Sequence, residues 1–344
     1  MPSLRTDTVG KPLFDLRSFG RHGPGRRDHL SPADLAVITR TVRRTPEVMV
    51  KVLTHGGQNL GAVGRHFNYI DRGGELLIET DDGTPLKGRG VGRSLIEDWD
   101  LDLEKDRRAA NVKARGIKRP PKLVHKLLFS MPAGTPSQRV LAAVKAFARE
   151  EFGAKHRYAM VLHIDEPHPH VHMVVKAVSE EGVRLNIKKA TLRDWRQEFA
   201  RHLREQGVAA NATDRQVRGV VNPQKTDGIH RAAMRGASTH WRQRTAAVAR
   251  ELNRQDVEPE PGMAHLLQTR QEILRGWRAL VDELVMQNQI ELAQAIRRFA
   301  ARMPPAQTEK EWIRNRLLRR HLVPADESCR DRPEQFAAHI PSNG

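Results

Sequence analysis

The chain has 344 residues, enough for one large or two ordinary domains, and 38% of them are hydrophobic. Its 59 lysines and arginines outnumber its 41 aspartates and glutamates, a formal net charge of +18, which predicts a polyanionic partner, by default a nucleic acid. The single cysteine, Cys329, excludes an internal disulfide or a cysteine-based zinc site, and no stretch approaches the ~20 apolar residues of a membrane span.

The N-terminal residues 1–45 are expected to form a basic, loosely structured arm, because arginines alternate there with glycines and prolines. A short helix is predicted after Ser31-Pro32, since serine favours the N-cap and proline the first helical position. The first 25 residues lack the apolar run of a secretory signal. Together with the cysteine content, this predicts a cytoplasmic location without membrane insertion.

An α+β core is predicted over residues 46–225. It opens with a strand at 48–53 and a helix that begins at Asn59 and ends at Gly73-Gly74. The core-facing stripe of this helix comprises Leu60, Val63, Phe67 and Ile70.

The rest of the core alternates between strands and helices after a charged, irregular stretch at 86–122 with some helix between Ser94 and Ala110. The two strands that follow the second helix are joined by a short polar segment, which predicts an antiparallel hairpin. Thr191 and Asp194 resemble a capping box at the start of the last helix. The predicted elements are a strand at 74–79, a strand at 123–129, a helix at 137–152, strands at 157–163 and 170–177, and a helix at 191–206.

The C-terminal region, residues 226–344, is predicted to be helical and of unknown role. Apolar residues recur at helical intervals between 263 and 302, and no further strand pattern is present. The sequence thus predicts an α+β domain with an α-helical C-terminal extension.

Four histidines fall within ten positions around the predicted hairpin. His170 and His172 are two residues apart on one strand and therefore point to the same face, and His163 ends the neighbouring strand beside them. Three converging imidazoles predict a metal site. Asp165 is a candidate to accept the free N–H of a ligand histidine, whereas His168 lies in the turn without such a constraint.

The chain has only two tyrosines. Strand alternation places Tyr158 on the face opposite His163, which indicates a packing role.

Tyr69 falls on the side of its helix opposite the buried stripe, with Arg65, His66 and Arg72 as neighbours. Positive charge there would favour the phenolate and bind a phosphate. The alternative for Tyr69 is a structural tyrosine at a domain contact.

Three segments resemble, in order, the motifs of the relaxase or mobilisation nuclease family, a branch of the HUH endonucleases. The resemblance is to the P-type mobilisation relaxases, the group of the T-DNA border endonucleases. Residues 67–74 are similar to the nucleophile motif, residues 125–134 to the strand with a DNA-positioning serine, and residues 163–175 to the histidine triad motif. Met131 departs from the phenylalanine that is usual before the proline of the second motif. The tyrosine precedes the histidines, as in relaxases, and the resemblance covers about residues 46–220.

The resemblance implies a central antiparallel sheet flanked by helices and a specific chemistry. Tyr69 would attack the scissile phosphate, Asp165 would orient a ligand and Ser130 would position the strand. A divalent metal, Mg²⁺ or Mn²⁺, would be bound by His163, His170 and His172. The implied activity is site- and strand-specific nicking of a mobile element's transfer origin through a rejoinable 5′-phosphotyrosine intermediate, for conjugative transfer or mobilisation.

Single-stranded or melted origin DNA is the implied partner. A relaxosome accessory protein and a type IV secretion coupling protein are further candidates, and the chain itself is a candidate for translocation with the DNA. Two alternatives stay open: a tri-histidine metallohydrolase that activates water, and a basic origin-binding protein with a structural metal and no nicking activity. Candidate DNA-backbone contacts are Arg65, Arg72, Lys118, Arg119, Lys122, Lys188, Lys189 and Arg193.

Overall fold

The computed structural model describes residues 15–21, 30–53, 56–105, 121–220, 232, 238–254 and 260–322. The chain divides into two compact units. The first contains residues 44–212 and holds a six-stranded sheet, and the second combines residues 13–43 with 213–343. Each unit is described separately.

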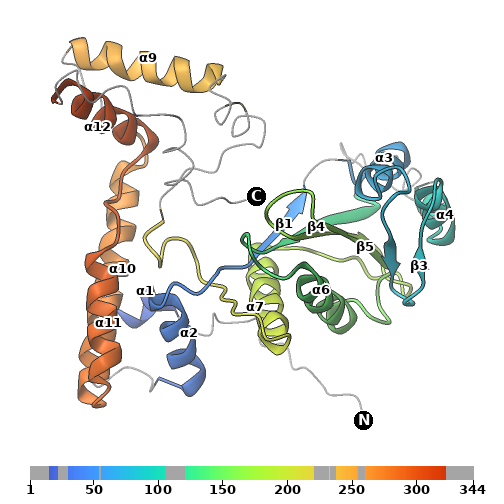
Figure 1. Ribbon diagram of the computed structural model, residues 1–344, viewed down its shortest axis with the longest axis horizontal. Helices are drawn as coiled ribbons and strands as arrows, with labels where there is room; N and C mark the ends of the chain where they lie inside the picture. The colour runs from blue at the N-terminus through green and yellow to red at the C-terminus, as the bar shows by residue number, and fades with distance from the viewer. Residues whose placement is uncertain are drawn as a thin grey trace. The chain divides into compact units, whose positions relative to one another are not determined.

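The sheet of the first unit has the strand order β1-β4-β6-β5-β2-β3, and every neighbouring pair is antiparallel (Figure 1). This confirms the predicted α+β fold with a central antiparallel sheet. The strands are β1 (Met49–Leu53), β2 (Ile78–Thr80), β3 (Pro85–Leu86), β4 (Val124–Ser130), β5 (Tyr158–His163) and β6 (His170–Lys176).

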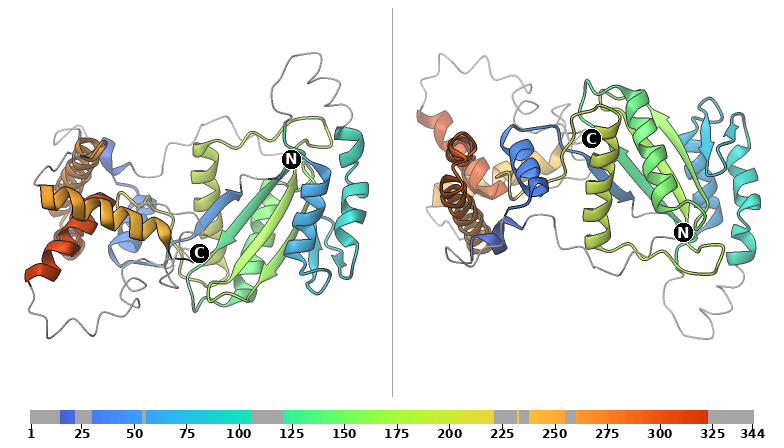
Figure 2. Two further views of the ribbon diagram at one scale, coloured as in Figure 1. Left: turned by 90° about the horizontal axis from the view of Figure 1, so that it is seen from above. Right: turned by 90° about the horizontal axis from the view of Figure 1, so that it is seen from below.

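One face of the sheet is covered by α6 (Ser137–Glu151) and α7 (Lys189–Glu205) (Figure 2). Its core is aromatic, because Phe129 of β4 packs against Phe147 of α6 and Phe199 of α7, with ring centroids 5.1 and 5.2 Å apart. Tyr158 is buried in this layer beside Phe152, as strand alternation predicts. This side of the sheet therefore forms the larger hydrophobic core of the unit.

The other face carries α3 (Leu60–Ile70) and α4 (Val91–Asp98). Asn59 caps α3 by accepting the Ala62 N–H, and Phe67 packs edge-to-face on Trp99, 5.8 Å between centroids. Val161 of β5 belongs to the same cluster. Helix α3 is thereby fixed over the face to which the odd residues of β5 point.

The second unit is helical in the part that the structure describes. Helices α10 (Met263–Met286) and α11 (Ile290–Ala301) pack together around Trp277 and Phe299. Helices α9 (Thr239–Arg254) and α12 (Glu309–Leu322) contact each other through Trp241 and Trp312.

Residues 1–45 differ from the expected loose arm where the structure describes them. They contain α1 (Leu16–Phe19) and α2 (Pro32–Val42), the latter with a capping box between Ser31 and Asp34. Leu16 and Ile38 are buried among the residues of α10 and α11. Because these apolar side chains complete a core built mainly from the C-terminal helices, this segment groups with them.

Two local expectations are also corrected. The stretch at 86–122 begins with the last residue of the short strand β3, and its helix α4 starts at Val91, before the expected Ser94. Helix α7 starts at Lys189, so Thr191 lies inside the first turn, where its hydroxyl accepts the Lys188 N–H. The expected pairing of Thr191 with Asp194 is therefore wrong.

Candidate active site

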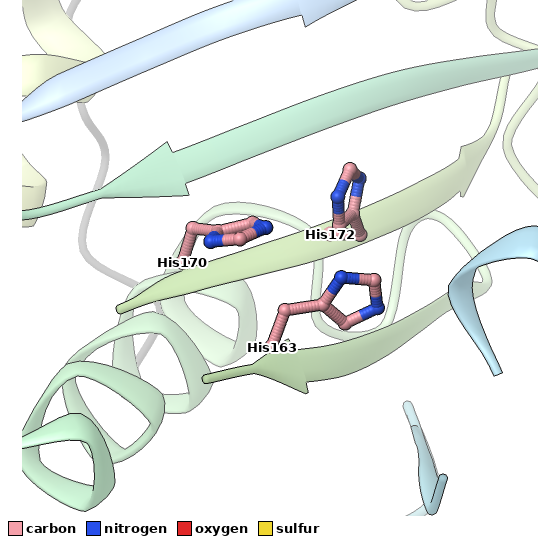
Figure 3. A group of neighbouring side chains, drawn as sticks. All are labelled: His163, His170 and His172. Carbon is pink, nitrogen blue, oxygen red and sulfur yellow. The ribbon is translucent and has the colours of Figure 1, made fainter. Parts of the chain in front are cut away.

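The three histidines of the hairpin converge on one face of the sheet (Figure 3). His163 of β5 lies directly opposite His170 of β6 in the strand register. One ligand atom from each of His163, His170 and His172 can be chosen so that all three lie within 4.8 Å of one another. His163 is 1% exposed and His172 5% exposed, whereas His170 is partly exposed, so two of the three imidazoles are buried.

The outer nitrogens of two imidazoles are held by backbone carbonyls. His163 Nε2 lies 2.7 Å from the Ile70 carbonyl, and His170 Nδ1 lies 2.9 Å from the His168 carbonyl. A carbonyl can only accept, so these nitrogens carry the protons, and the lone pairs lie on His163 Nδ1 and His170 Nε2. His172 Nδ1 is buried without a hydrogen-bond partner among the described residues.

Burial also favours the neutral, metal-binding form of His163 and His172. Burial and the neighbouring His163 and His170 lower the pKa of His172 to about 2, and burial lowers the pKa of His163. A donor set of three imidazole nitrogens, with the rings of His163 and His170 oriented by backbone carbonyls, fits a divalent cation. The site therefore has the chemistry of a metal centre.

Tyr69 lies next to this cluster, on the exposed side of α3. Its side chain is 51% exposed, and its ring centroid is 5.9 Å from that of His172 and 6.3 Å from that of His163. His66, one turn earlier, stacks on Tyr69 and meets His172 edge-on. The structure thus brings the tyrosine and the histidines together from separate elements.

Arg72 follows α3 in the left-handed conformation, with φ of 54°. It is the first of three consecutive residues with positive φ, the other two being Gly73 and Gly74. A side chain at Gly74 would collide with the backbone of Gly88, since its Cβ would lie 2.4 Å from that carbonyl carbon. This turn directs Arg72 toward the site, where its guanidinium carbon lies 5.1 Å from the centroid of the Tyr69 ring.

Asp165 has a partner other than the expected one. Its carboxylate accepts a hydrogen bond from Arg72, and its distance to His163 Nδ1, 3.9 Å, is too long for a hydrogen bond. The orienting acceptor of His163 is the Ile70 carbonyl. The expectation that Asp165 accepts a ligand N–H is therefore corrected.

Ser130 and Lys126 share the histidine face of β4. Ser130 is paired with His170 in the register and is buried. Lys126, which sequence reasoning passed over, is 6% exposed and donates to the Ala62 carbonyl at 3.3 Å. Burial, Arg65 and Lys122 lower its pKa. The position of Lys126 beside α3 follows from the strand register and could not be predicted from the sequence.

The remaining basic candidates are more dispersed. Arg65 is exposed on α3, whereas Lys188 and Lys189 are exposed at the start of α7, which packs on the opposite face of the sheet. Lys118 and Arg119 lie outside the described residues.

A second group of potential metal ligands joins α6 and α7: Glu150, Glu198 and His202. Arg201 donates to both carboxylates, at 2.6 Å to Glu150 and 2.8 Å to Glu198. A cation of the protein itself therefore neutralises this group.

No helix in the described part of the chain is long and apolar enough to span a membrane.

Comparison with known proteins gives two matches. Residues 94–208 match the MobA/VirD2-like nuclease domain of relaxases. This range contains Ser130 and the three histidines and begins after Tyr69. The chain is also similar to the T-DNA border endonuclease VirD2 of Rhizobium radiobacter, with 23% identity over 199 residues, 54% of this chain and 46% of that protein. The chain thus spans about half the length of this relative. Together, the two matches support a relaxase-type nuclease domain in this chain.

Proposed function

We propose that the chain nicks one strand of DNA at a mobile element's transfer origin through Tyr69, which becomes bonded to the 5′ phosphate of the cut strand. The observation that carries the proposal is the position of the Tyr69 ring beside His163 and His172. Two segments more than 90 residues apart meet there, one with a nucleophile and the other with a metal-binding donor set.

The metal would be held by His163 Nδ1, His170 Nε2 and His172. When bound, a divalent ion such as Mg²⁺ or Mn²⁺ would neutralise charge that develops on the phosphate. The carbonyls of Ile70 and His168 fix the rings so that their lone pairs point inward.

The nucleophilic step would belong to Tyr69. Its hydroxyl loses a proton to solvent, and the Tyr69 Oη–P bond forms while the P–O3′ bond breaks. The departing oxygen takes up a proton and becomes a 3′-hydroxyl. The phosphotyrosine ester is close in energy to the phosphodiester that it replaces, so the 3′-hydroxyl can attack it and rejoin the strand.

The neighbouring side chains would place the phosphate. Arg72, over the Tyr69 ring, can donate to phosphate oxygens and stabilise the phenolate. Ser130, opposite His170, would contact the strand near the break. Arg65 would contact the DNA backbone from the exposed side of α3, and Lys188 and Lys189 are weaker candidates because they begin α7 on the opposite face.

The net charge of +18 supports single-stranded or locally melted DNA as the substrate. The proposed context is conjugative transfer or mobilisation from the bacterial cytoplasm. A relaxosome accessory protein, a type IV secretion coupling protein and translocation of the chain with the DNA belong to the same proposal. The helices of residues 226–344 are the candidate surface for such partners.

A denaturing gel tests the proposal. A pool of random single-stranded oligonucleotides, labelled at the 3′ end, is incubated with the full chain and Mn²⁺. We expect a labelled protein adduct that is lost in Tyr69→Phe and with a chelator but retained in Tyr158→Phe. Sequencing of the captured strands gives the nick site.

The same gel separates the alternatives. Cleavage without an adduct, retained in Tyr69→Phe, would indicate a metallohydrolase that activates water. DNA binding without any cleavage would indicate an origin-binding protein with a structural metal.

A further inference from the structure

The guanidinium of Arg72 lies beside the nitrogen of His163 that a metal ion would use. Arg72 Nη2 lies 3.4 Å from His163 Nδ1. Because His163 Nε2 is committed to the Ile70 carbonyl at 2.7 Å, Nδ1 is the only nitrogen of this ring that can bind an ion. Arg72 therefore donates toward the lone pair that the metal centre requires.

Asp165 accepts a hydrogen bond from the guanidinium of Arg72. Its carboxylate is bonded to the same Nη2 atom of Arg72, and it is about half exposed, whereas His163 is fully buried. A carboxylate bound to a guanidinium fixes its position and offsets its charge. Asp165 thus acts on the metal centre through Arg72.

We propose that Arg72 and the metal ion compete for His163 Nδ1, and that Asp165 is a positioning residue that holds the guanidinium when the ion takes this nitrogen. The proposal rests on the metal centre proposed above and not on strand cleavage. Two like charges next to one imidazole repel each other, so occupation of one position weakens the other.

The consequence is that the metal ion binds before the DNA phosphate. With His163 Nδ1 taken by the ion, Arg72 keeps Asp165 and the Tyr69 ring as neighbours, and its N–H group is released from the histidine toward a phosphate. The ion would therefore raise the affinity for DNA through Arg72 as well as directly.

Mn²⁺ titrations of the chelator-treated full chain without DNA test the competition. We expect Arg72→Gln to bind Mn²⁺ about tenfold more tightly than the original chain, and Arg72→Lys to fall between the two. Arg65→Gln is the matched control, because it removes an equal charge from the exposed side of α3. Thermal melting verifies that each variant is folded.

A double-mutant cycle tests the role of Asp165. Asp165→Asn should weaken Mn²⁺ binding about fivefold in the original chain and clearly less in the Arg72→Gln background, because the effect is transmitted by the arginine. An equal loss in both backgrounds would show that Asp165 acts on the ligands directly and would overturn its assigned role.

Two further results would overturn the competition. One is Arg72→Gln binding Mn²⁺ with unchanged or lower affinity, and the other is no Mn²⁺ binding that depends on the histidines. Failure of the nicking proposal would give a different result. A chain that follows the predicted Mn²⁺ affinities but forms no DNA adduct would contradict strand cleavage and still support the competition between Arg72 and the ion.

Discussion

Gly92 of α4 controls how closely this helix approaches the tyrosine-bearing helix α3. A Cβ atom at Gly92 would lie 2.4 Å from Cβ of Phe67, a fully buried residue two positions before Tyr69. Gly92→Ala therefore forces α3 and α4 apart by about 1 Å to restore an ordinary contact.

The expected cost follows from this overlap. Overpacking of a buried contact costs about 1–3 kcal/mol, and in a domain of this size each kcal/mol lowers the melting temperature by about 2–4 °C. A shift of about 1 Å in a reacting group can lower a rate on the order of 100-fold, so strand cleavage should fall further than stability alone explains.

Gly64 of α3 provides the matched control, since the nearest atom to its added Cβ, Ile96 Cδ1, is at a normal distance of 3.5 Å. Gly64→Ala should raise the free energy of unfolding by up to about 1 kcal/mol through helix propensity and leave the rate unchanged. Thermal melting and single-turnover adduct formation measure both quantities. The packing argument fails if Gly92→Ala melts with the original chain and forms adduct within threefold of its rate.

Three other predictions concern pH, the second tyrosine and the ion. Burial lowers the pKa of His125 to about 4. Below about pH 6.5 the unfolded chain therefore binds more protons than the folded chain, and the free energy of unfolding decreases as the pH drops toward 4. His125→Gln should reduce the decrease between pH 7 and pH 5 by about 1–2 kcal/mol, as measured by urea unfolding. Tyr158→Phe should keep adduct formation and change the free energy of unfolding by less than about 1 kcal/mol, because the ring packs in the core; loss of the adduct would refute the assignment of Tyr69. Mn²⁺ at 100 times its dissociation constant should stabilise the chain by about 2.7 kcal/mol in thermal melting, and an equal effect in His170→Ala would contradict binding by the histidines.

Much of the fold and the site follows from local periodicity. The burial of Tyr158 and the exposure of Tyr69 were predictable, because two-residue alternation and the helical repeat decide which face a side chain takes. The convergence of His163, His170 and His172 follows from the hairpin register.

The contacts that orient the site were not predictable. The acceptor of His163 is the backbone carbonyl of Ile70, and a carbonyl has no signature in the sequence. Its position depends on the packing of α3 against the sheet. Arg72 likewise reaches Asp165 because of a left-handed turn after α3, although an arginine at a positive φ carries no sequence signal.

The association of the N-terminal helices with the C-terminal unit was missed for a related reason. Leu16 packs in one cluster with Trp277, far away in the sequence, and such pairing is not encoded in a local pattern. Short α1 and β3 offer too few residues for a periodic signal.

The most direct measurement of the central claim is mass spectrometry of the peptide that remains bonded to a nucleotide after the DNA adduct is digested. The chain has only two tyrosines, so the attachment point is decisive. The proposed reaction predicts a 5′-phosphotyrosine bond at Tyr69. A bond at Tyr158, at another residue type, or no bond despite strand cleavage would contradict it.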